Sequence, residues 1–136
     1  LVGDSVTTPE ERFSIGDISI TSGTVGKPSA TVEMQIDGVS RKQTALGVGP
    51  VDALFRAVAE LTGTKSELIR YQVHAVTAGL DALGEVSVTV DEDGRRVIGH
   101  GAHEDVLVAS GKAYVHAINR LEWHKGRRGA NEPRGI

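Results

Sequence analysis

The chain of 136 residues contains no cysteine, and only 4% of its residues are aromatic. The absence of cysteine excludes disulfide bonds and thiolate metal ligands, and it fits a reducing compartment, so we expect a cytoplasmic protein. Because aromatic residues are scarce, the core must be built mainly from Val, Ile, Leu and Ala. No apolar run reaches the length of about 18 residues that a transmembrane helix needs, so we expect no membrane contact.

Positive charge is also not in excess, since 15 Lys and Arg residues face 18 Asp and Glu residues and leave a net charge of −3. This balance gives no support for a nucleic-acid partner. The length suits a single domain with a real core. The first residues, LVGDSVTTPEER, lack an initiator Met and the basic and apolar segments of a signal peptide. We therefore expect a fragment of a longer protein or a processed product.

The most regular local pattern is the stretch 47–63, GVGPVDALFRAVAELTG. Pro50 suits the first position of a helix, Asp52 places negative charge near its positive end, and Gly63 is a typical residue after its last turn. Between these signals the apolar residues recur at helical spacing: Val51, Leu54, Phe55, Val58 and Leu61. The pattern predicts a helix that starts at Pro50, follows a glycine turn and stops at Gly63.

Alternating apolar residues and turn signals predict the other elements. The expected strands are 13–20, with a bulge at Gly16-Asp17, then 30–37, 39–46, 68–78, 85–91 and 95–100. Hairpin turns are expected at Asp37-Gly38 and at 91–94. A second helix is expected over 104–122, with a core face of Val106, Leu107, Ser110, Ala113, Tyr114, Ala117, Ile118 and Leu121.

The two halves of the chain repeat, because Gly47-Val48-Gly49 aligns with Gly99-His100-Gly101 at an offset of 52 residues. The sequence therefore predicts an α+β fold of two βββα units, a pseudo-twofold domain with two helices packed on antiparallel sheets. Residues 1–11 are expected to be a linker from an upstream domain, 12–124 the folded domain, and 125–136 a flexible basic tail. Val108 and Val115 form an extra apolar stripe, which is either a subunit interface or two scattered surface valines.

Few residues suggest catalysis. The cluster His100–Asp105 could hold zinc in principle, although acidic residues at a helix start also have a purely structural role. A binding function fits better. A glycine turn before a helix can receive a carboxylate, and Val48, Val51, Tyr71, Ala75 and Ala82 could form an apolar pocket, which together suit a free amino acid. The alternative is that the glycines only form turns.

Six segments in order resemble one known family: 22–24 (SGT), 30–32 (ATV), 47–53 (GVGPVDA), 71–79 (YQVHAVTAG), 81–86 (DALGEV) and 105–121 (DVLVASGKAYVHAINRL). They are similar to the C-terminal regulatory domain of 2-isopropylmalate synthase, over roughly residues 12–122. The resemblance implies a βββα repeat that forms a homodimer and binds L-leucine, or a related branched-chain amino acid, at the dimer interface. That binding would inhibit the catalytic domain of the same polypeptide in leucine biosynthesis.

Carried over by position, the resemblance implies a ligand site with three groups of residues. The turn would contribute Gly47, Val48, Gly49, Pro50 and Val51; Tyr71, Ala75 and Ala82 would surround the side chain; Asp81 and Asp105 would contact the amino group, directly or through water. It implies no catalytic residues and no cofactor in this chain. The parent acyltransferase would condense acetyl-CoA with 2-oxoisovalerate in a barrel that uses a divalent metal, so the chain alone should lack synthase activity.

The resemblance leaves alternatives open. His103 and Glu104 stand where the family pattern favours small or hydroxyl residues, and His116 stands where Asn is frequent. Citramalate synthases share this domain type, so isoleucine is an alternative ligand. The domain could also serve only for assembly, without binding a ligand, or a small metal enzyme could be built on the His100–Asp105 cluster.

Overall fold

The computed structural model describes residues 11–76 and 83–131, which form six strands and two helices. The strands are β1 (Phe13–Thr21), β2 (Ser29–Ile36), β3 (Val39–Leu46), β4 (Glu67–Val76), β5 (Leu83–Glu92) and β6 (Arg95–His103). The helices are α1 (Pro50–Thr62) and α2 (Val106–Asn131). The order is βββα twice, so the predicted fold class is confirmed, and α1 has the start and the Gly63 stop that its sequence predicted.

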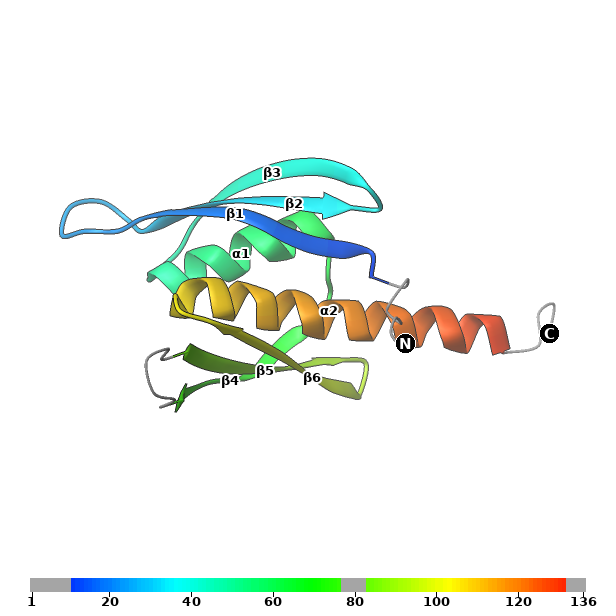
Figure 1. Ribbon diagram of the computed structural model, residues 1–136. Coiled ribbons are helices and arrows are strands. Elements are labelled where there is room, and N and C mark those ends of the chain that lie inside the picture. Colours follow the sequence, from blue (N-terminus) through cyan, green and yellow to red (C-terminus); the bar gives the residue numbers. More distant parts are fainter. Residues whose placement is uncertain (1–10, 77–82, 132–136) are drawn as a thin grey trace.

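Each unit folds into one antiparallel sheet, with the orders β1-β2-β3 and β4-β5-β6. The two helices lie between the two sheets, α1 against the first and α2 against the second (Figure 1). Alternation along the central strand of each sheet supplies the core, because every second residue faces the helix layer. These buried residues are Ala30, Val32 and Met34 on β2 and Val86, Val88 and Val90 on β5.

The repeat is real, but its offset differs from the one that the glycine motifs suggested. The tight turns Asp37-Gly38 and Asp93-Gly94 lie 56 residues apart and share positive φ angles at both positions. Each unit also has an irregularity in its first strand, between Ile15 and Ile18 in β1 and between Leu68 and Arg70 in β4. The alignment of the two glycine motifs was therefore wrong, because Gly99-His100-Gly101 lies within β6 and does not form a turn before a helix.

Gly99 and Gly101 are instead the positions where α2 comes closest to β6. A Cβ at Gly99 would lie 2.2 Å from the carbonyl oxygen of Ala113, and one at Gly101 would lie 2.3 Å from that of Ala109. Both distances are far below van der Waals contact, and in both cases the obstacle is backbone. The glycines thus let the helix lie directly on the strand.

The extra apolar stripe on α2 is largely used within the chain. Val115 is buried and Val108 is half-buried. On the same side of the helix, a Cβ at Gly111 would meet the side chains of Ile15 and Ile18 on β1. Neither alternative, a subunit interface or scattered surface valines, holds for Val115, because α2 has a second buried side that faces the first unit.

Helix α2 also supplies hydrogen bonds to the outer edges of both sheets. The side chain of Asn119 accepts from the N–H of Phe13 (3.1 Å) and donates to its carbonyl (2.8 Å), as a neighbouring strand would. On the other sheet, the Nδ1 of His116 accepts from the N–H of His100 (2.9 Å), and Arg120 donates to the carbonyl of Ile98 (2.7 Å). Burial, Arg120 and His100 lower the pKa of His116, which keeps its ring nitrogen available as an acceptor.

The second helix is longer than expected, since it continues to Asn131 where the sequence favoured a tail from residue 125. Gly126 and Gly129 weaken the helical pattern there, but Lys125 forms ion pairs with Glu92 (2.9 Å) and Glu122 (3.0 Å) that hold the first part of this extension. Almost all of the expected linker lies outside the described residues. Within the described part of the chain, neither helix combines the length and apolar character that crossing a bilayer requires.

We predict that Gly99→Ala lowers the free energy of unfolding by about 1–3 kcal/mol, because its Cβ must push α2 away from β6. Gly23→Ala is the matched control, since no atom lies within 4 Å of a Cβ at that position. Urea denaturation of both variants would test this, and equal stabilities would contradict the close packing of α2 on β6.

Candidate functional site

Several of the predicted site residues come together at one end of the sandwich, which we call the turn end. The turn before α1, the end of β4, the start of β5 and the start of α2 all lie there (Figure 1). Residues 47–51 and Asp105 belong to these segments, whereas Tyr71 lies in the middle of β4, where it pairs with Val88. Ala75 pairs with Gly84 at the end of β4. Asp81 and Ala82 lie outside the described residues.

The turn before α1 packs closely against its own helix. The N–H of Gly47 donates to the carbonyl of Pro28 (3.0 Å), and a Cβ at Gly47 would lie 2.4 Å from the backbone nitrogen of Ala53. Only glycine allows this close approach. The Oδ2 of Asp52 accepts from the N–H of Val48 (2.9 Å) and from Arg56 (2.9 Å). The hydrogen bond from Val48, followed by that from Arg56, lowers the pKa of Asp52.

The outer side of the same turn is open. Gly49 has an extended backbone, with φ −156°, and a Cβ there would meet no atom within 4 Å. The side chain of Val48 is 89% exposed. Gly47 and Gly49 therefore have different roles, since the first is required by the fold and the second leaves space beside the start of α1.

Tyr71 connects this end to the core through three aromatic rings. The ring of Phe55 on α1 lies edge-on to that of Tyr71, with centroids 5.6 Å apart, and 4.6 Å from that of Tyr114 on α2. Phe55 follows Val51 by four residues, so the two share one face of α1. Burial raises the pKa of Tyr114, as expected for a hydroxyl inside the core. Tyr71 thus joins β4 to both helices.

The hydroxyl of Tyr71 lies 2.8 Å from the Oγ of Ser110, a fully buried residue of α2. Ser110 itself donates to the carbonyl of Val106 (2.7 Å) in the first turn of that helix. Gly84 lets β5 approach the same turn of α2, because a Cβ there would lie 2.8 Å from a methyl group of Val106. Ser110 was predicted as a core residue, but its link to Tyr71 depends on the distance between two elements, which periodicity does not give.

Asp105 has a structural role at the start of α2. Its Oδ1 accepts from the N–H of Leu107 (2.8 Å), which caps the helix, and its own N–H donates to the Nδ1 of His103 (3.0 Å). The residue is exposed. An interaction with an amino group would therefore have to coexist with the cap.

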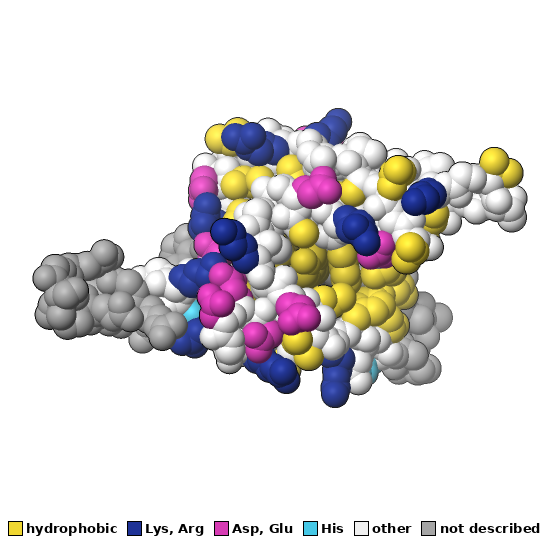
Figure 2. Space-filling view, turned by 180° about the vertical axis from the view of Figure 1, so that it is seen from behind, with side chains coloured by type: hydrophobic (Ala, Val, Ile, Leu, Met, Phe, Trp, Pro, Cys, Tyr) yellow, Lys and Arg dark blue, Asp and Glu magenta, His cyan; other side chains and the backbone are white. Residues whose placement is uncertain are grey.

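Next to these residues, β4 has an apolar surface that the helices cover only in part: Tyr71 contacts Phe55 and Ser110, but α2 packs mainly on β5 and β6. We call it the β4 patch: Leu68, Tyr71 and Val73, which pair with the buried Val90, Val88 and Val86 and share their face of the sheet. Leu68 is 44% exposed and Val73 is 49% exposed. Figure 2 shows hydrophobic side chains gathered between the two sheets on one side of the molecule. The alternation predicted a strand, but not that its apolar side would remain open.

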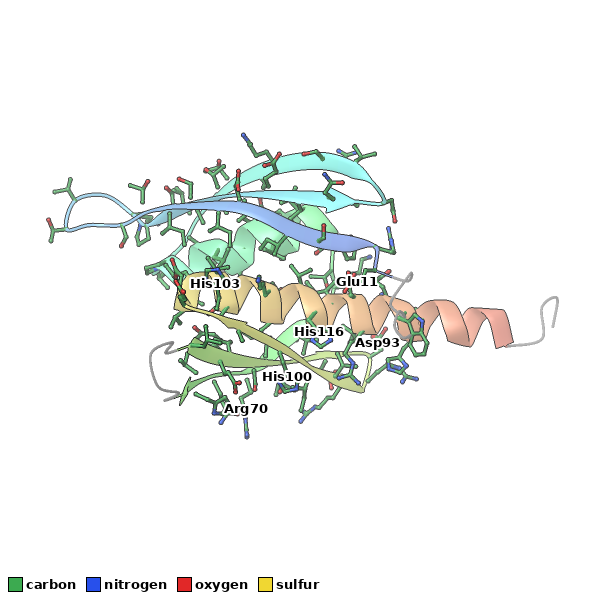
Figure 3. The ribbon with its side chains drawn as sticks, in the orientation of Figure 1. Glu11, Arg70, Asp93, His100, His103 and His116 are labelled. Atoms are coloured by element: carbon green, nitrogen blue, oxygen red, sulfur yellow. The ribbon has the colours of Figure 1, made fainter. Side chains whose placement is uncertain are left out.

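The two histidines of the cluster His100–Asp105 do not converge on one site. Residues three apart in a strand lie on opposite faces, so His100 and His103 diverge, and Figure 3 shows His103 apart from His100 and His116. His100 and His74 both approach the hydroxyl of Ser87, at 3.4 Å and 3.3 Å. In the ranges 11–76 and 83–131, no group of three or more His, Asp or Glu side chains could hold a metal ion.

A hollow of about 390 Å³ lies beside this histidine pair. It is lined by Glu85, Val86, Ser87, His100, Gly101 and Ala102. None of the predicted ligand-site residues lines it, so this hollow is separate from the predicted ligand site.

Two βββα units that pack through their helices and leave one apolar strand face open define a small α+β assembly domain. The chain belongs to the family of the LeuA allosteric (dimerisation) domain, whose family model matches residues 1–122. It is 46% identical over 116 residues to the 2-isopropylmalate synthase of Syntrophus aciditrophicus, an alignment of 85% of this chain and 22% of that protein. It is 43% identical over 122 residues to the same enzyme of Prochlorococcus marinus, an alignment of 89% of this chain and 23% of that protein. The chain thus spans less than a quarter of the length of these relatives.

The hydrogen bonds that Asp52 accepts from Val48 and Arg56 should make the stability of the turn depend on pH. Because the folded-state pKa of Asp52 is lowered, its contribution is complete above the pKa of an unfolded Asp, about 3.9, and decreases as the pH falls toward the folded value. We predict that Asp52→Asn is less stable than the wild type at pH 7, and that the difference shrinks toward pH 3. Denaturation with urea across this range would measure it, with the exposed Asp17→Asn as control. A difference that does not change with pH would contradict a stabilising role for the charge of Asp52.

Proposed function

We propose that this chain is the leucine-binding regulatory domain of a 2-isopropylmalate synthase and that it mediates feedback inhibition of a catalytic domain in the same polypeptide. The family and the names of the relatives support the parent enzyme. The observation that supports the ligand assignment is the open turn before α1, together with Tyr71 packed against Phe55 of that helix and hydrogen-bonded to Ser110 of α2. The condensation of acetyl-CoA with 2-oxoisovalerate, and the divalent metal that it uses, belong to the parent protein in this proposal.

The chemistry of the turn end suits an α-amino acid with an aliphatic side chain. Pro50 has no N–H, and the N–H of Val48 already donates to Asp52. The carboxylate of the amino acid would therefore be received by the remaining N–H groups in the first turn of α1. The side chain would lie between Val51 and Tyr71, both of which pack on the core. The amino group would face Asp81 or Asp105.

In our proposal the domain forms a homodimer by covering the β4 patch with a second copy of the chain. The family description supports a dimer, and Leu68 and Val73 leave apolar surface exposed beside Tyr71. The patch contains Tyr71, so the ligand would be bound where the two copies meet. Leucine would then inhibit the enzyme by binding one arrangement of the dimer more tightly than another.

Two other functions remain testable alternatives. An isoleucine-binding domain of a citramalate synthase would use the same fold, because moving one methyl group changes binding in an apolar pocket by only about 1–3 kcal/mol. A pure assembly module would dimerise without any ligand.

Isothermal titration of the dimer with leucine, isoleucine and valine tests the ligand. We expect the strongest binding with leucine, and at least about a ten-fold loss of affinity in Gly49→Val, because the added side chain fills the space beside the start of α1. Gly23→Val is the control, at another glycine with no atom near its Cβ. Strongest binding of isoleucine would favour the citramalate synthase domain, and no heat with any of the three would favour the assembly module. Normal leucine binding by Gly49→Val would place the site elsewhere.

Sedimentation velocity tests the dimer surface. We expect Val73→Asp to produce monomers, because it would bury a carboxylate in an apolar interface. Val39→Asp is the matched control, at an exposed valine at the start of β3. A Val73→Asp variant that remains dimeric would exclude the β4 patch as the interface.

A further inference from the structure

The hydroxyl of Tyr71 has a defined direction that the position of Ser110 imposes. A serine hydroxyl has a single hydrogen, and Ser110 gives it to the carbonyl of Val106 (2.7 Å). The oxygen of Ser110 is then an acceptor for the contact of 2.8 Å, so the hydroxyl of Tyr71 is the donor. The chain of hydrogen bonds runs from Tyr71 through Ser110 to the first turn of α2.

The surroundings of the Tyr71 ring restrict it further. Phe55 holds the ring from α1 in an edge-on contact with an interplanar angle of 89°. Ser110 is fully buried, so the polar end of Tyr71 points into the helix layer, while the residue as a whole is only half-buried. The hydroxyl of Tyr71 therefore points away from solvent, and Val73 lies two residues further along the same face of β4.

We propose that Ser110 is a positioning residue that sets the specificity of the site at the turn end: it keeps the Tyr71 hydroxyl turned inward, so that a bound amino acid meets only apolar ring surface. This inference rests on the proposed function, because it assumes that Tyr71 borders the ligand. Leucine and asparagine have nearly the same shape and differ in the polarity of the branched end. Ser110 would thus favour leucine over asparagine without touching either.

Four variants of the chain, each titrated with leucine and with asparagine, test the inference. In Ser110→Ala the hydroxyl of Tyr71 loses the partner that holds it in the helix layer, so the side chain can turn and offer the hydroxyl to a polar ligand. We therefore expect the ratio of leucine to asparagine affinity to fall about ten-fold. Tyr71→Phe breaks the same hydrogen bond but has no hydroxyl to release, so we expect it to keep the wild-type ratio. The double variant Ser110→Ala/Tyr71→Phe should also keep the wild-type ratio. Ser110→Thr retains a hydroxyl, so it should have the wild-type ratio as well.

The pattern separates positioning from a merely structural role. If the hydrogen bond only stabilised the fold, Ser110→Ala and Tyr71→Phe would change both affinities in parallel and leave the two ratios equal, which would overturn the inference. Thermal unfolding checks that each variant is folded, and Ser110→Cys, which is close to serine in volume, replaces Ser110→Ala if that variant does not fold. A wild-type chain that binds neither amino acid would reject the proposed function itself, whereas normal leucine binding with an unchanged ratio in Ser110→Ala would reject only the role of Ser110.

Discussion

The close approach of α2 to β6 is the constraint on which the rest of the structure depends. Gly99 and Gly101 have no side chains, so the backbone of α2 can approach β6 more closely than a larger residue would allow. At this distance His116 and Arg120 reach the edge of β6, while Asn119, from the same turns, reaches the edge of β1 in the other sheet. Unpaired strand edges are liable to pair with other chains. One helix therefore satisfies backbone groups on two sheets and fixes the distance between them.

The two units are similar in their elements but differ in how completely they are covered. In the first unit, α1 lies on β2 and β3, and α2 of the second unit reaches over to β1, where Gly111 faces Ile15 and Ile18. In the second unit, α2 lies on β6 and β5, and the main contact that reaches β4 from α1 is that of Phe55 with Tyr71. In the first unit α2 contacts the first strand, β1, whereas helices contact the first strand of the second unit, β4, much less, which leaves the β4 patch partly exposed. This difference explains why an interface and a ligand site are both proposed at the same strand.

Local patterns in the sequence were sufficient for the elements and the fold class. The limits of α1, the Asp37-Gly38 turn and the irregularity near Gly16 all follow from short-range chemistry. The repeat offset was misread because glycine has two uses, in turns and at close contacts, and only the helix above β6 distinguishes them. In the same way, the roles of Ser110 and Asn119 depend on partners 39 and 106 residues away, which no local pattern contains. The ligand residues came from the family resemblance and stay a prediction, since the structure places residues 47–51 and Asp105 at the turn end and Tyr71 in the middle of β4.

The bond between Phe13 and Asn119 also bears on how the chain acquires its structure during synthesis. These residues are 106 positions apart, so the hydrogen bonds at the edge of the first sheet cannot form until Asn119 has been translated, near the end of the domain. Contacts of such high sequence separation slow folding, because a long loop must close before they form. When the first βββα unit has left the ribosome and α2 has not, Ile15 and Ile18 of the first sheet still lack the helix that covers them. Co-translational folding of this domain is therefore completed only after α2 has emerged.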